Sequence, residues 1–329
     1  EKNNEKDDIE EDYIKEYVAG GRFSTGDGEA AFLNLPIEET PKVPWGNRED
    51  WISPTKFGAI KDDKISDSDA IQKAIDSGKK TVYLPNGTYR ISKPIIVRGS
   101  VERIIGCEAQ LFVDKSMHGS KKPVFRIEDG PGTPIIFERF NGMPFEDREF
   151  HWFEHASPRT VIFKNLNLFT SQVYKNTVPG GKIFIEDVAS QTKGGGFWDL
   201  KGQTLFARQF NTERGGEGTI NILNDGGSVW ILGLKTERDG TIVKTLNNGK
   251  TEILGGHFYG LRYPKKDPMF IIEDSNFAVS AAETVFNWGT PYEEIVKVSD
   301  AGKTKLYKKS DFPEHLKGVV IPLFSTKEK

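Results

Sequence analysis

Two glutamates in the second half of the chain are the strongest candidates for chemistry. Glu213 and Glu237 are 24 residues apart, and each ends a short apolar run. If adjacent strands bring them together, one carboxyl group could act as general acid and the other as base or nucleophile in glycoside hydrolysis. Crowding of like charges would separate their pKa values and so support these roles. Alternatively, both are solvated acids paired with Lys235, Arg208 or Arg214, because exposed charge pairs are common.

Lys235 and His257 could serve a different reaction, the β-elimination of an acidic polysaccharide. That reaction needs a base for the proton alpha to a uronate carboxylate and a cation that holds the carboxylate. Asn211 occupies the same position of the repeat as Lys235 and His257. Tyr259 lies two residues after His257, so His257 as the base and Tyr259 as the acid could form a catalytic pair. Calcium is expected as a cofactor only for such a lyase. The alternative is a surface histidine that packs beside an aromatic ring.

Three further residues are candidates for binding sugar. The guanidinium of Arg208 could clamp a sugar carboxylate, or it could hold the coil in shape through backbone carbonyls. Trp198 and Trp230 could stack on pyranose rings, because aromatic faces bury a large area at low entropic cost. Trp230 could equally lie in the core. Trp198 follows Gly194–Gly196, which is expected to be a flexible loop, and Trp288 is expected to be a packing residue.

The elements that would position these residues are indicated by a repeat of 22 to 24 residues. The repeat aligns Leu166, Val188, Phe210, Leu234 and Gly256. The preceding column is rich in residues that tolerate a left-handed backbone: Asn165, Asp187, Gln209, Gly233 and Gly255. One coil of a parallel β-helix has this length, and its strands stack about 4.8 Å apart. Strand alternation then places the candidate residues at 211, 213, 235, 237, 257 and 259 on one outward face.

A single helix is expected before the strands begin. Ala70, Ile71, Ala74 and Ile75 lie on one helical face, and Ser66 or Asp67 can cap the N-terminus of a helix at about 67–77. Residues 81–91 then read as a strand, a tight Asn-Gly turn and a second strand. A short helix followed only by strands is how a β-helix covers its open end.

The remaining sequence suggests one large domain with an N-terminal extension. Residues 1–45 are expected to form an acidic tail and extension, and residues 46–329 a single β-helix domain. The prolines between 36 and 54, together with Trp45 and Trp51, indicate an extended segment that lies against a surface. A net charge of −3 and scattered basic residues exclude a nucleic-acid-binding field. No apolar run is long enough for a membrane span, and Cys107 is the only cysteine, so no internal disulfide can form.

Two stretches resemble known proteins. Phe57-Gly-Ala, Asp67–Ile75 and Leu84-Pro-Asn-Gly-Thr-Tyr resemble the N-terminal signature of the pectate-lyase-like β-helix superfamily, which includes phage tailspikes. The stretch that begins Gly202-Gln-Thr-Leu-Phe is similar to a bacterial β-helix subgroup. The resemblance implies an all-β, right-handed single-stranded parallel β-helix and a secreted, periplasmic or cell-surface location. It carries over no catalytic residue.

The function expected from these observations is the cleavage of a polysaccharide or oligosaccharide, with glycoside hydrolysis slightly favoured over lysis. The catalytic candidates are Glu213, Glu237, His257 and Lys235, and no metal ligand is assigned. The alternative is a non-catalytic β-helix that binds glycans, as in adhesins or tailspikes, because polar stripes can bind extended chains without cleaving them. The fold alone does not decide between these roles, and the sequence leaves the oligomeric state open.

Overall fold

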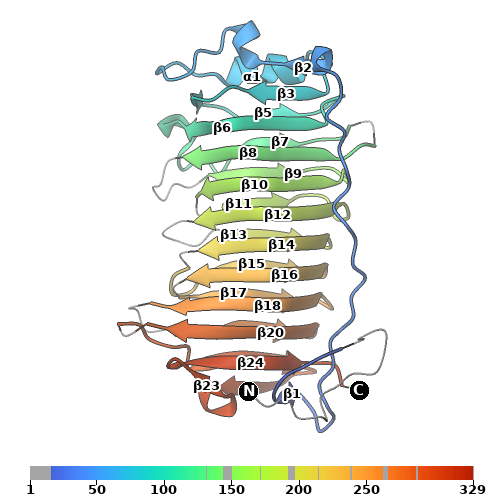
Figure 1. The fold of residues 1–329 in the computed structure, drawn as a ribbon, viewed down its shortest axis with the longest axis vertical. Coiled ribbons are helices and arrows are strands. Elements are labelled where there is room, and N and C mark those ends of the chain that lie inside the picture. The colour runs from blue at the N-terminus through green and yellow to red at the C-terminus, as the bar shows by residue number, and fades with distance from the viewer. Residues whose placement is uncertain are drawn as a thin grey trace, which may run out of the picture.

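The chain forms a solenoid of stacked coils with a helix at one end (Figure 1). The computed structural model describes residues 16–130, 132–143, 150–170, 172–191, 197–213, 215–237, 239–261, 266–286 and 288–328. Strands of successive coils pair in parallel, and each coil contributes one strand to each of two sheets. The prediction of an all-β parallel β-helix with a short N-terminal capping helix is therefore confirmed. The acidic tail at 1–12 and the glycines at 194–196 lie outside the described residues.

The two sheets differ in the length of their strands. The first sheet contains β1 (Arg22–Ser24), β2 (Trp51–Ile52), β3 (Thr81–Leu84), β4 (Thr88–Ile91), β6 (Arg103–Val113), β8 (Ile135–Met143), β10 (Val161–Phe169), β12 (Lys182–Gln191), β14 (Thr204–Glu213), β16 (Ser228–Glu237), β18 (Lys250–Gly260), β20 (Asn276–Val285), β23 (Glu314–His315) and β24 (Gly318–Ser325). The second contains β5 (Ile95–Val97), β7 (Pro123–Ile127), β9 (His151–His155), β11 (Gln172–Asn176), β13 (Phe197–Lys201), β15 (Ile220–Asp225), β17 (Thr241–Leu246), β19 (Phe270–Glu273), β21 (Glu294–Asp300) and β22 (Lys303–Lys308). The described helices are α1 (Ser68–Ile75) and the 3₁₀ turns at Arg48–Asp50, Pro54–Phe57, Lys115–Met117 and Lys309–Asp311.

The stacking register agrees with the repeat in the sequence. Leu166 pairs with Val188, Val188 with Phe210, Phe210 with Leu234, and Leu234 with Gly256. The residue before each of these has a left-handed backbone, with φ between 49° and 83°. Each long strand therefore bends at this column, and its two halves face in different directions. Two positions after the register, the side chains point into the solenoid, as expected, and are buried: Leu168, Ser190, Thr212, Thr236 and Phe258.

The capped end differs from expectation in two details. Asp67 precedes α1, but its side chain does not cap the helix; its carboxylate accepts hydrogen bonds from Ile60 N (3.0 Å) and Arg90 N (2.8 Å). It thus ties the loop before the helix to β4. The strands on either side of Asn86 and Gly87 do not form a hairpin, because both β3 and β4 pair in parallel with β6. The chain bends there and continues in the same direction.

Residues 30–45, here called the strap, run along the outside of the solenoid from its C-terminal end to its capped end (Figure 1). Leu33, Leu35 and Val43 of the strap share one apolar cluster with side chains that point outward from the first halves of the long strands: Ile136, Ile162, Phe184, Phe206 and Trp230. The carboxylate of Glu252 accepts hydrogen bonds from Asn34 N (2.9 Å) and Leu35 N (3.0 Å). The strap therefore covers an apolar stripe that the β-helix alone would expose, which fits the extended segment predicted from the prolines.

Replacement of Glu252 by Ala is expected to loosen the strap. Two backbone N–H groups would lose a charged acceptor, and each such bond contributes roughly 1.5–3 kcal/mol. Limited proteolysis should then cleave residues 30–45 faster than in the wild-type protein, while the coils stay protected. Glu273→Ala is the matched control, because its partly exposed carboxylate pairs only with Lys244 among the described residues. Equal cleavage rates in both variants would exclude an anchoring role for Glu252.

Candidate functional site

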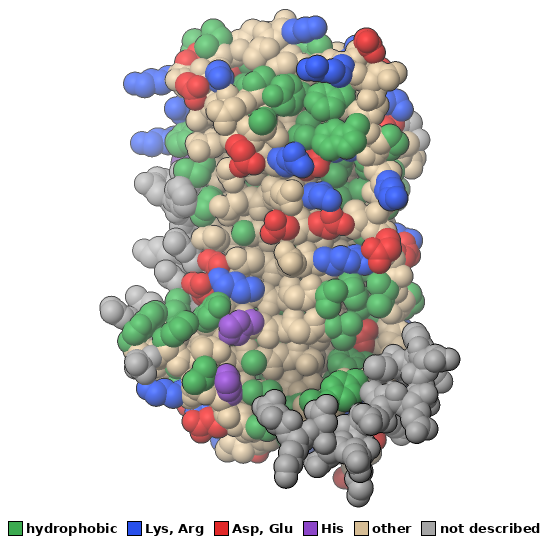
Figure 2. All heavy atoms as spheres, viewed as in Figure 1, with side chains coloured by type: hydrophobic (Ala, Val, Ile, Leu, Met, Phe, Trp, Pro, Cys, Tyr) green, Lys and Arg blue, Asp and Glu red, His purple; other side chains and the backbone are tan. Residues whose placement is uncertain are grey.

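A groove of about 540 Å³ lies on the outside of the first sheet, where β14, β16 and β18 bend. Its floor is low because Gly233, Gly255 and Gly256 carry no side chain, and its border includes Asn211, Lys235 and His257. A second hollow of about 410 Å³ shares Gly255 and Gly256 and continues toward β20 and β24. Figure 2 shows a strip of backbone and small side chains along this face, with charged side chains beside it. The groove thus follows the bend column, and three predicted site residues border it.

Glu213, Lys235 and Glu237 form one ion-paired cluster, here called the carboxylate cluster. Lys235 Nζ donates to Glu213 Oε1 and, at 2.6 Å, to Glu237 Oε1. Asn211 Nδ2 also donates to Glu213 Oε1, at 2.8 Å. The Glu213 side chain is only 12% exposed and that of Glu237 is 33% exposed. The structure therefore brings the two predicted carboxylates together around Lys235, one of the three partners proposed for them; Arg214 lies outside the described residues.

The charge state of Lys235 limits its role. Partial burial lowers its pKa, but hydrogen bonds and charge attraction from Glu213 and Glu237 outweigh this effect, so the pKa of Lys235 is raised. Lys235 therefore stays protonated near neutral pH and serves as a cation rather than as the base of a lyase. Two carboxylates already neutralise it, so the cluster carries a net charge of about −1 and attracts an anionic sugar poorly.

Aromatic rings continue the face beyond the carboxylate cluster. His257, Tyr259, Phe286 and Trp288 are here called the aromatic cluster. Tyr259 stacks on Phe286 with ring centroids 5.5 Å apart, and Phe286 stacks on Trp288 at 6.1 Å. His257 packs against Tyr259 at 4.5 Å, and its Nε2 lies 3.0 Å from Thr284 Oγ1. Lys235 Nζ lies 5.3 Å from the centre of the Tyr259 ring, which joins the two clusters.

Phe286 and Trp288 are the functional candidates that the sequence analysis missed. Their exposed fractions are 44% and 53%, so the expectation that Trp288 is a packing residue is wrong. Both residues directly follow β20, one coil beyond Tyr259. In the sequence, an aromatic pair one coil beyond an outward tyrosine is the signal that indicates these two residues.

Three predicted binding residues lie elsewhere. Trp198 is fully buried inside the solenoid, where its Nε1 donates to Ser190 Oγ at 3.2 Å, so it cannot be a sugar platform. Trp230 is 4% exposed and lies beneath the strap. Arg208 Nη2 donates to the backbone oxygen of Glu38 and pairs with Glu39, both next to Leu35 on the strap. Trp230 and Arg208 therefore hold the strap rather than a ligand.

The structure gives no metal site or membrane span within the described residues. No group of three or more His, Cys, Asp or Glu side chains there could hold a metal ion. His151 and His155 belong to strand β9 and are buried. No helix in the described part of the chain is long and apolar enough to cross a membrane.

The described coils, bend column and capping helix define the class of protein as a parallel β-helix. Residues 51–118 match the model of a family described as rhamnogalacturonase A/epimerase, pectate lyase-like. The match covers the segment that carries the N-terminal signature and supports the resemblance of that segment to the pectate-lyase-like β-helix superfamily. No curated protein sequence matches the chain.

Several solved structures are similar in fold. ORF18 of Geobacillus virus E2 is 12% identical, with a TM-score of 0.44; the match covers 73% of this chain but only 62% of the viral protein. PfbA, a surface protein and adhesin of Streptococcus pneumoniae, is 14% identical, with a TM-score of 0.43 and coverage of 76% and 85%. A family GH82 iota-carrageenase from A. fortis is 15% identical, with a TM-score of 0.44 and coverage of 76% and 58%. These likenesses concern the fold alone.

Proposed function

We propose that this protein binds a polysaccharide along the groove, with the aromatic cluster as the surface on which sugar rings pack. The observation that carries this proposal is a row of stacked rings beside a groove bordered by Asn211 and Lys235: Tyr259, which is half-buried, and Phe286 and Trp288, which are exposed. Aromatic rings favour the apolar faces of pyranoses. Amide, carboxylate and ammonium groups next to them can exchange hydrogen bonds with hydroxyl groups. The glycan segment in the groove is uncharged, because the carboxylate cluster is net negative.

The family match supports a carbohydrate ligand, since rhamnogalacturonase and epimerase are the activities in the family's description. We place this function outside the cytoplasm, where extended polysaccharides are found. The groove follows the bends of successive strands and is open along its length, so a long chain can enter from the side without threading an end. An open groove of this kind favours binding of internal segments.

Binding is tested with the purified protein and a panel of neutral and acidic polysaccharides. Affinity electrophoresis should show retardation in gels that contain at least one neutral polysaccharide. Addition of calcium should leave this retardation unchanged, because the proposed contacts between the groove and the glycan are ring packing and hydrogen bonds, without a metal ion. Migration unaffected by every neutral polysaccharide in the panel would reject the proposal.

Hydrolysis of the bound glycan is the second candidate function, favoured by the two carboxylates on successive coils that Lys235, a residue at the border of the groove, holds together. Their bridge to Lys235 must open before one of them reaches a glycosidic oxygen. Incubation with the bound polysaccharide should then release reducing ends without the ultraviolet absorbance of an unsaturated uronate. The raised pKa of Lys235 disfavours an elimination in which Lys235 acts as the base.

Glu213→Gln and Glu237→Gln test this second candidate. Loss of a general acid or base lowers a rate by roughly 100- to 10,000-fold, so each variant should bind but hardly cleave. Glu273→Gln is the control for a charge change at an exposed site of the second sheet. Cleavage at the wild-type rate by both groove variants would exclude catalysis by these carboxylates and leave binding as the function.

A further inference from the structure

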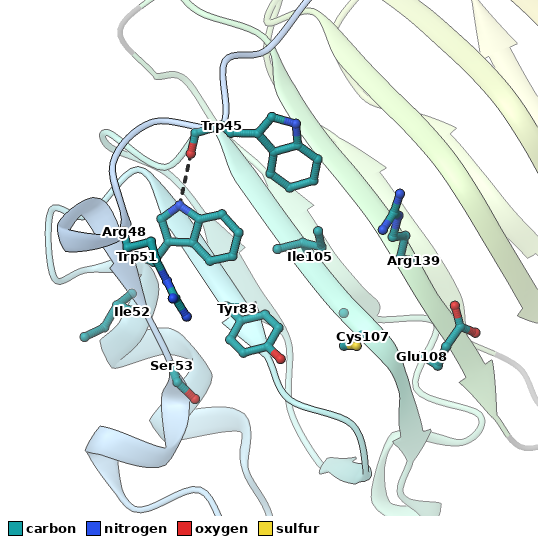
Figure 3. Close-up of a pocket in the computed structure, with 11 residues that line it drawn as sticks. Trp45, Arg48, Trp51, Ile52, Ser53, Tyr83, Ile105, Cys107, Glu108 and Arg139 are labelled. Carbon is teal, nitrogen blue, oxygen red and sulfur yellow. Dashed lines mark hydrogen bonds between the residues drawn. The ribbon is translucent and has the colours of Figure 1, made fainter.

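A second cleft lies on the same sheet at the capped end of the solenoid. It has a volume of about 490 Å³ and is lined by side chains from the strap, β2, β3, β6 and β8 (Figure 3). Between β6, which contributes to the cleft, and β16, which contributes to the middle of the groove, there are five coil steps, so the two hollows are roughly 24 Å apart. The two hollows are therefore separate sites.

One wall of the cleft is aromatic and fixed in place. Trp45 and Trp51 stack with ring centroids 5.9 Å apart, and Tyr83 lies 5.9 Å from Trp51. Trp51 Nε1 donates a hydrogen bond of 3.0 Å to the backbone oxygen of Trp45 (Figure 3). Arg103 covers Trp45 at 4.0 Å from the ring centre. Trp45 is nevertheless 49% exposed, so an ordered aromatic surface faces the cleft.

Two exposed arginines give the cleft its positive charge. Arg139, from the bend of β8, lies across the cleft from the tryptophans, whereas Arg48, from the turn before β2, lies beside Trp51 (Figure 3). Neither arginine has an ion-pair or hydrogen-bond partner among the residues that the structure describes. Glu108, at the bend of β6, is the one carboxylate in the lining, so the cleft carries a net charge of about +1. This sign is opposite to that of the carboxylate cluster.

We infer that this cleft binds an anionic sugar residue, a uronate or a sulfated pyranose. An aromatic wall takes the apolar face of the ring, and an unpaired guanidinium forms paired hydrogen bonds with a carboxylate or sulfate. A free anion would use only the arginines and a neutral sugar only the rings, whereas an anionic sugar uses both. The inference rests on the proposed function only in taking a saccharide as the ligand.

Cys107 allows a direct test, because this exposed and only cysteine lines the cleft. The rate of its alkylation by iodoacetamide is measured with three oligosaccharides of equal length: an oligogalacturonate, a sulfated one and a neutral one. We expect at least one of the two anionic oligosaccharides to slow alkylation several-fold at low millimolar concentration, and the neutral one to have no effect. Protection by the oligogalacturonate alone identifies a uronate, and protection by the sulfated one identifies a sulfate ester. No protection by either, or equal protection by inorganic sulfate, overturns the inference.

Arg139→Gln assigns the effect to the cleft. Gln209 occupies the equivalent bend position with φ of 54°, against 58° for Arg139, so the backbone accepts glutamine there. Loss of the guanidinium should weaken protection roughly 10- to 100-fold in oligosaccharide concentration. Arg98→Gln, which removes a charge near the same end but beside the second sheet, should leave protection unchanged. Unaltered protection in Arg139→Gln contradicts the inference, whereas loss of binding at the groove alone does not affect it.

Discussion

Replacement of Trp198 by Ala should lower the free energy of unfolding by about 3–5 kcal/mol, the cost of removing a large aromatic side chain from a packed core. Trp198 is fully buried. Its ring stacks on Tyr174 at 5.6 Å and meets Phe210 edge-on at 5.0 Å. The resulting cavity would lie between the two sheets, where the neighbouring rings are held on both sides and cannot close around it.

Thermal unfolding of Trp198→Ala and Trp288→Ala measures this difference. Both variants lose an indole, but Trp288 is half exposed, so its loss should change the midpoint little. Below its midpoint, Trp198→Ala should still bind glycan as the wild-type protein does. If Trp198→Ala unfolded at a temperature close to that of the wild-type protein but no longer bound glycan, Trp198 would be a sugar-binding residue rather than a core residue.

Acid should destabilise the protein through His155. Burial lowers the pKa of His155 from 6.5 to about 4, and the nearby charge of Arg159 acts in the same direction. The unfolded chain therefore takes up a proton between about pH 6.5 and 4 that the folded chain does not. Stability is lost as pH falls through this range. A shift from 6.5 to 4 corresponds to about 3 kcal/mol at the acid end.

His155→Asn is the variant for this test, read as the unfolding midpoint against pH. The variant loses packing and is less stable at neutral pH, but its midpoint should fall less steeply between pH 6.5 and 4. His151, whose pKa burial also lowers to about 4, remains and accounts for part of the residual slope. His315→Asn, at an exposed histidine, should keep the wild-type slope. An unchanged slope in His155→Asn would show that folding does not lower the pKa of His155.

The fold was predictable because its constraints are local. The long strands turn sharply at the same place in successive coils, and from β10 to β18 four of the five bend residues are Asn, Asp or Gly. Gln209 fits the column only through its position, since its type alone does not indicate a left-handed backbone. The same column also predicts which residues border the groove, because the second residue after each bend points outward. Asn211, Lys235 and His257 occupy this position.

The misassigned residues depend on contacts that span long stretches of sequence. Arg208 and Trp230 contact a strap about 170 to 200 residues earlier in the chain, and the repeat contains no information on that segment. A weak signal existed in β10, where Val161, Ile162 and Phe163 are consecutive and apolar, a pattern typical of strands covered on both faces. Trp198 and Leu200 also alternate with Asp199 and Lys201, which indicates an inward tryptophan.

The central claim is that sugar rings pack on the aromatic cluster, and a binding titration of Phe286→Ala/Trp288→Ala tests it most directly. The polysaccharide most strongly retarded by the wild-type protein is titrated against both proteins by calorimetry. Each exposed ring is expected to contribute about 1–2 kcal/mol, so the dissociation constant should rise roughly 30-fold or more in the double variant. Protection of Cys107 in the separate cleft should be retained, which shows that the variant is folded. A dissociation constant within a factor of about two of the wild-type value, in a folded variant, would contradict the account.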